Sequence, residues 1–287
     1  MAGIQPRLLK GFRDLLPAEM LFRDRIIEQI KQVYESYGFA PLSTPSLEYK
    51  EMLLAYGDET SKQIYLFRDP DGYDVGLRFD LTVPLSRVTA QYIDLPRPFK
   101  RYQIQPVWRY DKPDPGRFRE FIQFDIDTVG SGSMVADAEI ISAIHESLSK
   151  LGLKSKVRFS NRKVLNSLMT FAEIPQEMAH AVFRVLDKLE KQGREAVRLE
   201  LGPGRVDESG ARITGLGLQP SQIDRIERFL ALPQSTREEA LASARSLFAN
   251  VAGAENGIDE LEQIHKYLDA LGIDSDCAPI DLSIARG

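Results

Sequence analysis

The chain has 287 residues, of which 43% are hydrophobic and 28% are charged, and its formal net charge is −5. This composition is typical of a globular protein with one large or two smaller domains, and no apolar run approaches the roughly 20 residues that a membrane helix requires. The negative charge argues against non-specific nucleic-acid binding, and the single cysteine, Cys277, excludes an internal disulfide. We therefore expect a cytoplasmic protein with no membrane partner.

The N-terminal part of the chain predicts an amphipathic helix, a hairpin and a second helix. Apolar residues recur at helical spacing over 22–37. Residues 64–67 and 75–81 are typical of two strands around a turn, and 81–92 is typical of a helix whose first turn contains Pro84.

Residues 99–127 form the most informative segment, in which two alternating runs flank a turn from Lys112 to Gly116. Because side chains alternate across a strand, one face is apolar and is expected to face the core, whereas the other face is polar. The polar face carries Gln103, Gln105, Arg109, Asp111, Arg117, Arg119, Phe121, Gln123, Asp125 and Asp127. Three arginines and one aromatic ring favour an anionic, ring-bearing ligand; the open alternative is an ordinary solvated face of an antiparallel sheet.

The rest of the chain is mostly helical in pattern. A helix is expected over 136–151, a strand over 154–159, and a further helix after Asn161, which is a suitable N-cap. After a charge-dense helical stretch, a helix over 258–271 and a strand over 278–284 complete the predicted elements.

These elements predict an α+β fold in which helices flank a mainly antiparallel sheet, because the strands arrive as hairpins rather than as regular βαβ units. We expect a first core part over 1–171, a helical insertion domain over 172–255 and a return to the core over 256–287. No glycine-rich nucleotide-binding motif occurs, and no histidine has a Cys or His neighbour at ligand spacing, so we expect no metal site.

Six segments together resemble the catalytic domain of class II aminoacyl-tRNA synthetases and, among them, the histidyl-tRNA synthetase family. They are Gly11-Phe-Arg-Asp-Leu-Leu-Pro17, Thr44-Pro-Ser-Leu-Glu48, Leu77-Arg-Phe-Asp-Leu-Thr-Val-Pro84, Val107-Trp-Arg-Tyr-Asp111, Arg117-Phe-Arg-Glu-Phe-Ile-Gln123 and Asp281-Leu-Ser-Ile-Ala-Arg-Gly287. The resemblance implies a class II synthetase-like fold and a histidine–tRNA ligase, which activates histidine with ATP to histidyl-adenylate and transfers it to tRNA(His). It also implies a homodimer, and Mg²⁺ that accompanies ATP without an assigned protein ligand.

The resemblance implies a nucleotide site on the polar face. Arg109 and Arg286 would be catalytic at the α-phosphate, and Arg117 would reach the γ-phosphate. Asp111, where the family more often has Glu, would accept a hydrogen bond from the adenine amino group, and Phe121 would stack on the adenine ring.

The resemblance implies a histidine site beside the nucleotide. Asp80, Thr82 and Gln123 would bind the α-ammonium group, and Asp127 would accept a ring N–H. Two alternatives stay open: Asp80 is also suited to cap the helix that starts near Thr82, and Asp127 to be a strand-end cap or a surface carboxylate.

The third class II motif and the anticodon-binding domain have no counterpart in the sequence. We therefore expect a truncated catalytic domain that is inactive or impaired alone. One rival is a histidine-sensing regulatory subunit of ATP phosphoribosyltransferase, although a regulator has no need of phosphate-binding arginines. The other rival is an interaction module without ligand chemistry.

Overall fold

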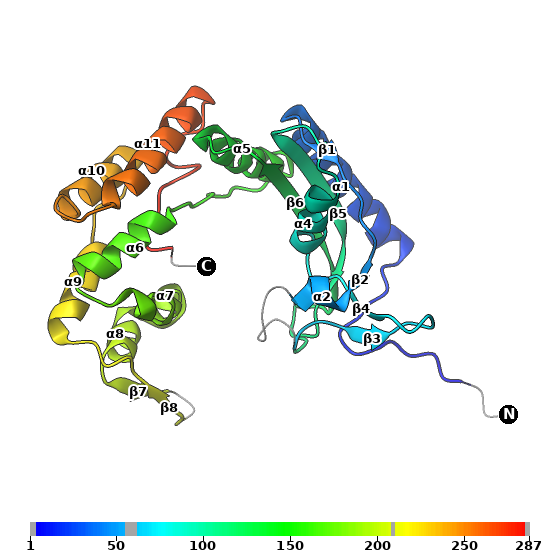
Figure 1. Ribbon diagram of the computed structural model, residues 1–287, viewed down its shortest axis with the longest axis horizontal. Helices are drawn as coiled ribbons and strands as arrows, with labels where there is room; N and C mark the ends of the chain where they lie inside the picture. Colours follow the sequence, from blue (N-terminus) through cyan, green and yellow to red (C-terminus); the bar gives the residue numbers. More distant parts are fainter. Residues whose placement is uncertain (1–3, 55–61, 208–209, 285–287) are drawn as a thin grey trace. The chain divides into compact units, whose positions relative to one another are not determined.

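The computed structural model describes residues 4–54, 62–207 and 210–284 (Figure 1). The chain divides into two compact units, Met1–Gly132 and Ser133–Gly287. The predicted domain boundaries at 171 and 255 were placed where the residue pattern along the sequence changes, whereas these two units are defined by their compactness. The predicted boundaries therefore stay a prediction. No helix in the described ranges has the length and apolar character that crossing a bilayer requires.

The first unit contains two three-stranded sheets and flanking helices (Figure 1). In the order β1-β5-β6, β1 runs parallel to β5 and β6 runs antiparallel to it, whereas β2-β4-β3 is antiparallel throughout. The strands are β1 (Ala40–Pro41), β2 (Leu47–Tyr49), β3 (Leu66–Arg68), β4 (Asp74–Leu77), β5 (Phe99–Trp108) and β6 (Glu120–Val129), and the helices are α1 (Pro17–Ser36), α2 (Lys50–Leu53) and α4 (Thr82–Gln91). The predicted α+β fold with a mainly antiparallel sheet is confirmed.

Helix α1 begins where local chemistry favours a start. Pro17 occupies the first helical position, and the Glu19 carboxylate accepts a hydrogen bond from the Leu16 backbone N–H at 3.0 Å. Near its C-terminal end α1 packs on β5, where the Tyr34 and Tyr102 ring centroids lie 5.9 Å apart. The C-terminal end of the helix therefore packs on Tyr102 of the apolar face, whose hydroxyl also donates to Glu35 Oε1 at 2.8 Å.

The β5–β6 hairpin has the register that the alternation predicts. Gln103 lies opposite Asp125, and Gln105 lies opposite Gln123, so the polar residues of both strands share one face. The polar face contains fully buried side chains, whereas Trp108, on the apolar face that was expected to face the core, is only partly buried. The reason is tertiary: segments outside the hairpin cover the polar face.

The second unit is built from helices and one short hairpin. Its elements are α5 (Met134–Lys150), α6 (Arg162–Phe171), a 3₁₀ turn (Gln176–Met178), α7 (Ala179–Leu186), α8 (Leu189–Leu201), β7 (Gly204–Val206), β8 (Arg212–Thr214), α9 (Pro220–Leu230), α10 (Arg237–Leu247) and α11 (Ala254–Ala270). The predicted cap at Asn161 is confirmed, since its Oδ1 accepts a hydrogen bond from the Lys163 N–H at 2.8 Å. Leu168 of α6, Phe229 of α9 and Leu261 of α11 belong to one hydrophobic core.

Two strand predictions in this unit were wrong. Neither segment forms a strand: the segments 154–159 and 278–284 pair at one parallel bridge between Phe159 and Ile280, where the Asp281 N–H donates to the Phe159 carbonyl at 2.9 Å. Conversely, the β7–β8 hairpin was not predicted, because its strands are three residues long and its glycines are typical of loops.

Candidate active site

The candidate site lies on the polar face of β5–β6, within the first unit. Arg78, which is 1% exposed, joins three segments that the sequence singled out. Its Nε donates to the Pro106 carbonyl at 2.8 Å, and its Nη1 donates to the Thr44 carbonyl at 2.8 Å and to Gln105 Oε1 at 2.9 Å. A buried guanidinium needs such partners, and in finding them it ties the loop before β2 to β5.

Arg109 follows β5 and is held by two aromatic rings. Its guanidinium carbon lies 4.3 Å from the Phe79 ring centroid and 5.2 Å from that of Phe121, and its Nε donates to the Phe79 carbonyl at 3.1 Å. Within the described ranges neither Nη atom of Arg109 makes a hydrogen bond or an ion pair. The side chain is therefore oriented by the protein while two donor groups remain for an anion.

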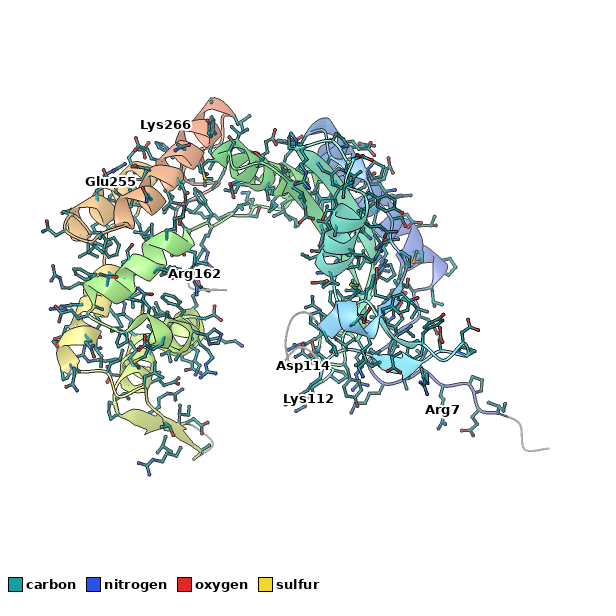
Figure 2. All side chains as sticks on the ribbon, viewed as in Figure 1. Arg7, Lys112, Asp114, Arg162, Glu255 and Lys266 are labelled. Carbon is teal, nitrogen blue, oxygen red and sulfur yellow. The ribbon has the colours of Figure 1, made fainter. Side chains whose placement is uncertain are left out.

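Two of the residues predicted to bind the nucleotide, Asp111 and Arg117, contact each other. Arg117 Nη2 lies 2.7 Å from Asp111 Oδ2, and Arg117 Nε donates to the same oxygen at 3.1 Å. They adjoin the exposed turn that carries Lys112 and Asp114 (Figure 2). The carboxylate proposed for adenine thus has a partner in the protein.

The N-terminal segment lies against the returning strand. The Arg119 N–H donates to the Gly11 carbonyl at 2.8 Å, and the Arg119 side chain crosses Gly11 so closely that a Cβ there would be 2.8 Å from Arg119 Cδ. Gly11 also has φ +88°, which strongly favours glycine. The segment 11–17 and the hairpin are therefore one structural assembly.

The residues predicted to bind an α-ammonium group lie beside this assembly. Asp80 Oδ1 accepts a hydrogen bond from the Val83 N–H at 3.1 Å, so the helix-capping contact weighed for Asp80 is present, and Thr82 begins α4. Gln123 Oε1 is buried and has no hydrogen-bond partner among the residues that the structure describes. An unpaired buried acceptor costs about 1–3 kcal/mol, which a donor from a ligand would remove.

Carboxylates gather at the far end of the same face. Asp127 pairs with the fully buried Arg101, whose Nη2 lies 2.6 Å from Asp127 Oδ2. Burial raises the pKa of Asp127, and Asp80 adds to the rise, whereas Arg101 opposes it. Burial likewise raises the pKa of Asp125, against the effect of Arg101 and Arg109.

The structure thus brings several predicted residues together. Arg109 contacts Phe121, Asp111 contacts Arg117, and Asp80 lies near enough to contribute to the raised pKa of Asp127, whereas Arg286 lies outside the described residues. The sequence analysis missed Arg101, although extending the alternation two residues back from Gln103 would have found it.

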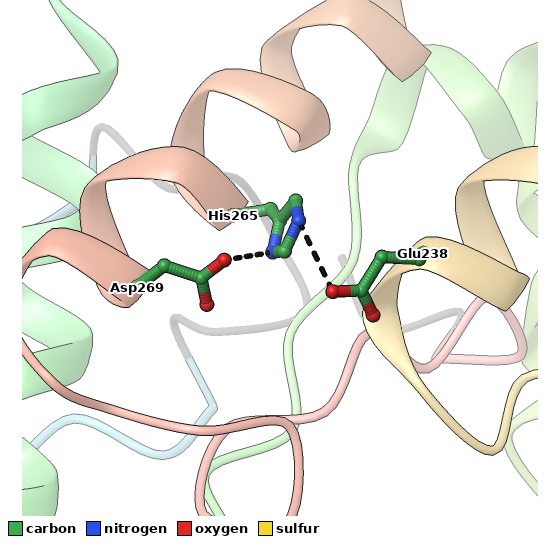
Figure 3. Close-up of side chains that lie close together, drawn as sticks. All are labelled: Glu238, His265 and Asp269. Atoms are coloured by element: carbon green, nitrogen blue, oxygen red, sulfur yellow. Dashed lines mark ion pairs between the residues drawn. The ribbon is translucent and has the colours of Figure 1, made fainter.

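A second cluster of titratable side chains lies in the second unit, where Glu238, His265 and Asp269 approach one another (Figure 3). His265 Nδ1 lies 3.4 Å from Asp269 Oδ2, and its Nε2 lies 3.6 Å from Glu238 Oε1. The buried Arg237 already occupies this cluster, since its Nε donates to His265 Nδ1 at 3.1 Å and its Nη2 lies 2.5 Å from Asp269 Oδ1. We read the cluster as the hydrogen-bonding shell of Arg237.

Comparison with known proteins identifies the family to which this sequence is similar. The family described as histidyl-tRNA synthetase matches residues 11–287. A histidine–tRNA ligase from Rhodopirellula baltica is 42% identical over 287 residues, which cover 99% of this chain and 62% of that protein. The chain thus spans about 60% of the length of the curated relatives it matches.

Solved structures agree with this placement. The histidyl-tRNA synthetase from Nostoc sp. PCC 7120 aligns with a TM-score of 0.84 and 32% identity, over 99% of this chain and 63% of that one. A Bacillus halodurans structure described as an ATP phosphoribosyltransferase regulatory subunit/histidyl-tRNA synthetase aligns with a TM-score of 0.77 over 97% of this chain and 69% of that one. Its identity of 24% shows the fold alone. From the family match and these relatives we conclude that the chain belongs to the histidyl-tRNA synthetase family.

Proposed function

We propose that the protein is a histidine–tRNA ligase, which activates histidine with ATP and transfers the histidyl group to tRNA(His). The single observation that carries the proposal is the position of Arg109. Its guanidinium is fixed between Phe79 and Phe121 with two donor groups available, and it acts electrostatically on Asp125 of the carboxylate cluster. An anion-binding arginine beside groups that attract a cation suits a reaction between ATP and an amino acid.

In the first step a histidine carboxylate oxygen attacks the α-phosphorus of ATP, and the bond to pyrophosphate breaks. Negative charge spreads over the α-phosphate oxygens, and Arg109 stabilises it without reorganisation because its side chain is already held. Arg286 is proposed for the same phosphate on the resemblance alone. Mg²⁺ enters with ATP as part of that substrate.

The remaining nucleotide contacts involve the turn of the hairpin. We assign Arg117 to the γ-phosphate, Asp111 to the adenine amino group and Phe121 to the adenine ring. Because Asp111 and Arg117 pair with each other, ATP binding would exchange that ion pair for two ligand contacts.

The histidine contacts use the inner part of the face. Gln123, Asp80 and Thr82 are assigned to the α-ammonium group, and Asp127 is assigned to a ring N–H. The buried, unpartnered Gln123 Oε1 supports this assignment, because an ammonium donor would satisfy it. A site that pairs polar groups of the substrate rejects analogues that lack them.

We further propose a cytoplasmic homodimer. The N-terminal end of α1 exposes apolar side chains, with Leu16, Leu21 and Phe22 each at least 63% exposed. A second copy of the chain would cover these side chains.

The test is histidine-dependent ATP–pyrophosphate exchange, followed by charging of tRNA(His). Both are measured on the longest translation product of the gene that contains this sequence. Exchange that needs histidine and is not supported by the other amino acids is expected. Absence of exchange at saturating ATP and histidine would refute the proposal, and histidine binding without ATP binding would indicate the regulatory role instead.

A further inference from the structure

Arg101 is a buried cation whose partners lie inside the candidate histidine site. Its side chain is 0% exposed, and it lies directly across the β5–β6 ladder from Asp127. Nη2 contacts Asp127 Oδ2 at 2.6 Å and donates to the Leu81 carbonyl at 3.3 Å, while Nη1 donates to Gln103 Oε1 at 3.3 Å. A charge is rarely buried in a sheet unless such partners compensate for its lost hydration.

The Arg101–Asp127 pair is asymmetric in its access to solvent. The Asp127 side chain keeps 30% of its surface exposed, whereas Arg101 keeps none. The guanidinium contacts the carboxylate as an ion pair through Oδ2, which is itself buried, so the exposed part of the Asp127 side chain lies away from Arg101. This geometry suits a support for a ligand-binding group, because a ligand can reach the exposed part of the carboxylate but cannot reach the enclosed guanidinium.

The charges around Arg101 do not balance. Asp127, Asp125 and Asp80 all act electrostatically on this one guanidinium, and Arg109 acts on Asp125 as a second cation. Three carboxylates therefore share one fully buried cation and one half-buried cation that the phosphate site also needs. The excess negative charge favours a cationic ligand, as the α-ammonium group and a protonated imidazole of histidine would be.

We propose that Arg101 is a positioning residue for histidine recognition: it fixes the Asp127 carboxylate in the orientation that receives the ring N–H and keeps that carboxylate charged. This inference rests on the proposed function. Arg101 itself touches no substrate, since its guanidinium is wholly enclosed. Its effect on binding passes through Asp127.

The first measurement separates histidine binding from ATP binding. In exchange assays on the same gene product, Arg101→Gln is expected to raise the KM for histidine by roughly 10- to 100-fold, because a misplaced acceptor loses its hydrogen bond. The KM for ATP should change by less than about twofold. Arg101→Lys keeps the charge but loses the planar fork, so a smaller rise in the histidine KM is expected.

The second measurement is a pH profile, which a merely structural role would not change. Arg101 lowers the pKa of Asp127, so its loss raises that pKa and leaves more of the carboxyl protonated at a given pH. In Arg101→Gln the fall of the histidine KM with rising pH should therefore be displaced to higher pH than in the wild type. Arg101→Lys should keep the wild-type profile.

The matched control is Arg237→Gln in the second unit, which removes another fully buried arginine paired with an aspartate. It should lower the melting temperature without changing the ratio of the two KM values. An unchanged histidine KM in both Arg101 variants, an equal rise in both KM values, an unaltered pH profile in Arg101→Gln, or failure of both variants to fold would overturn the proposal. Lack of exchange by the wild type would instead refute the proposed function.

Discussion

At the scale of the residue, the candidate site is a set of arginines whose surroundings assign them different tasks. Arg78 and Arg101 are fully buried and have protein partners, whereas Arg109 is half-buried and Arg117 lies on the exposed turn. Because a guanidinium is always charged, its burial decides whether it organises the protein or meets a ligand. The accessible arginines are therefore the candidates for phosphate contacts.

The first prediction concerns Arg109. Arg109→Ala should lower kcat/KM for pyrophosphate exchange by roughly 10²- to 10³-fold, the usual loss when one donor to a developing oxyanion is removed. The fold should survive, because within the described ranges the Arg109 side chain makes only one hydrogen bond, to the Phe79 carbonyl, and the backbone bonds of Arg109 stay available to alanine. Circular dichroism and the melting temperature verify the fold.

Its control is Arg68→Ala, since Arg68 is an arginine of the same unit with a 75% exposed side chain, whose contacts are an exposed hydrogen bond to the Gly72 carbonyl at 3.0 Å and a 3.9 Å ion pair with Asp74. That variant should keep wild-type exchange. If Arg109→Ala also kept it, Arg109 could not lie at the α-phosphate.

The second prediction concerns a buried carboxylate, Glu200, which is 2% exposed. Burial alone would raise its pKa, but hydrogen bonds from Lys188 at 2.5 Å and Arg205 at 3.0 Å outweigh burial, so the pKa is lowered. A lowered folded-state pKa stabilises the fold above the unfolded value of about 4.3, and that contribution is lost as pH falls through the folded value. Glu200→Gln should therefore cost about 1–3 kcal/mol at neutral pH.

The measurement is chemical unfolding of wild type and Glu200→Gln at several pH values. The difference in unfolding free energy should be constant above about pH 5 and shrink as pH falls below about 4. Glu190→Gln is the control, because that side chain is 67% exposed, so its ion pair with Arg158 should contribute little. A pH-independent difference for Glu200 would contradict the assignment.

At the scale of the element, close backbone approach explains a hairpin that the sequence analysis missed. A Cβ on Gly215 would lie 2.1 Å from the Gly202 carbonyl oxygen, so the segment after β8 packs directly on the end of α8. Gly215→Ala should destabilise the second unit by about 1–3 kcal/mol, the usual cost of overpacking. The melting temperature measures this effect.

Gly132→Ala provides the comparison, because a Cβ there meets nothing within 4 Å and Gly132 does not have a positive φ. Its melting temperature should stay at the wild-type value or rise slightly. Equal melting temperatures for the two alanine variants would show that the contact at Gly215 is relaxed in solution.

The same scale shows what a local pattern can predict. The period of two placed Gln103, Gln105, Gln123, Asp125 and Asp127 on one face, because side-chain direction in a strand depends only on local geometry. It could not predict that this face is covered, since the cover comes from distant segments such as the loop that carries Thr44. The pattern also could not predict that the segments 154–159 and 278–284 pair at only one bridge, because strand pairing depends on partners far apart in the chain.

At the scale of the whole molecule, family membership carries more information than any one motif. Each segment of the resemblance is short, but residues 11–287 match the family as a whole. Arg78 and Gly11 give this agreement a physical basis, because they join segments that are far apart in the sequence. The proposed dimer also belongs to this scale, because it would account for the exposed apolar side chains at the N-terminal end of α1.

The last prediction concerns that surface. Helix α1 buries Ile30, Val33 and Tyr34 near its C-terminal end, whereas Leu21 and Phe22 near its N-terminal end stay 63% and 67% exposed. A carboxylate introduced into an apolar contact between two copies would lose hydration without gaining a partner. Phe22→Asp should therefore shift the protein from dimer to monomer.

Sedimentation velocity over a range of concentrations measures this shift. The variant should keep its melting behaviour at low concentration, because Phe22 is mostly exposed within one chain and its replacement opens no cavity. Leu271→Asp is the control, since Leu271 is 52% exposed in the second unit, outside the surface proposed for the dimer. Dimers of unchanged affinity in Phe22→Asp would place the contact between copies elsewhere, and loss of association in both variants would reject the N-terminal end of α1 as its specific site.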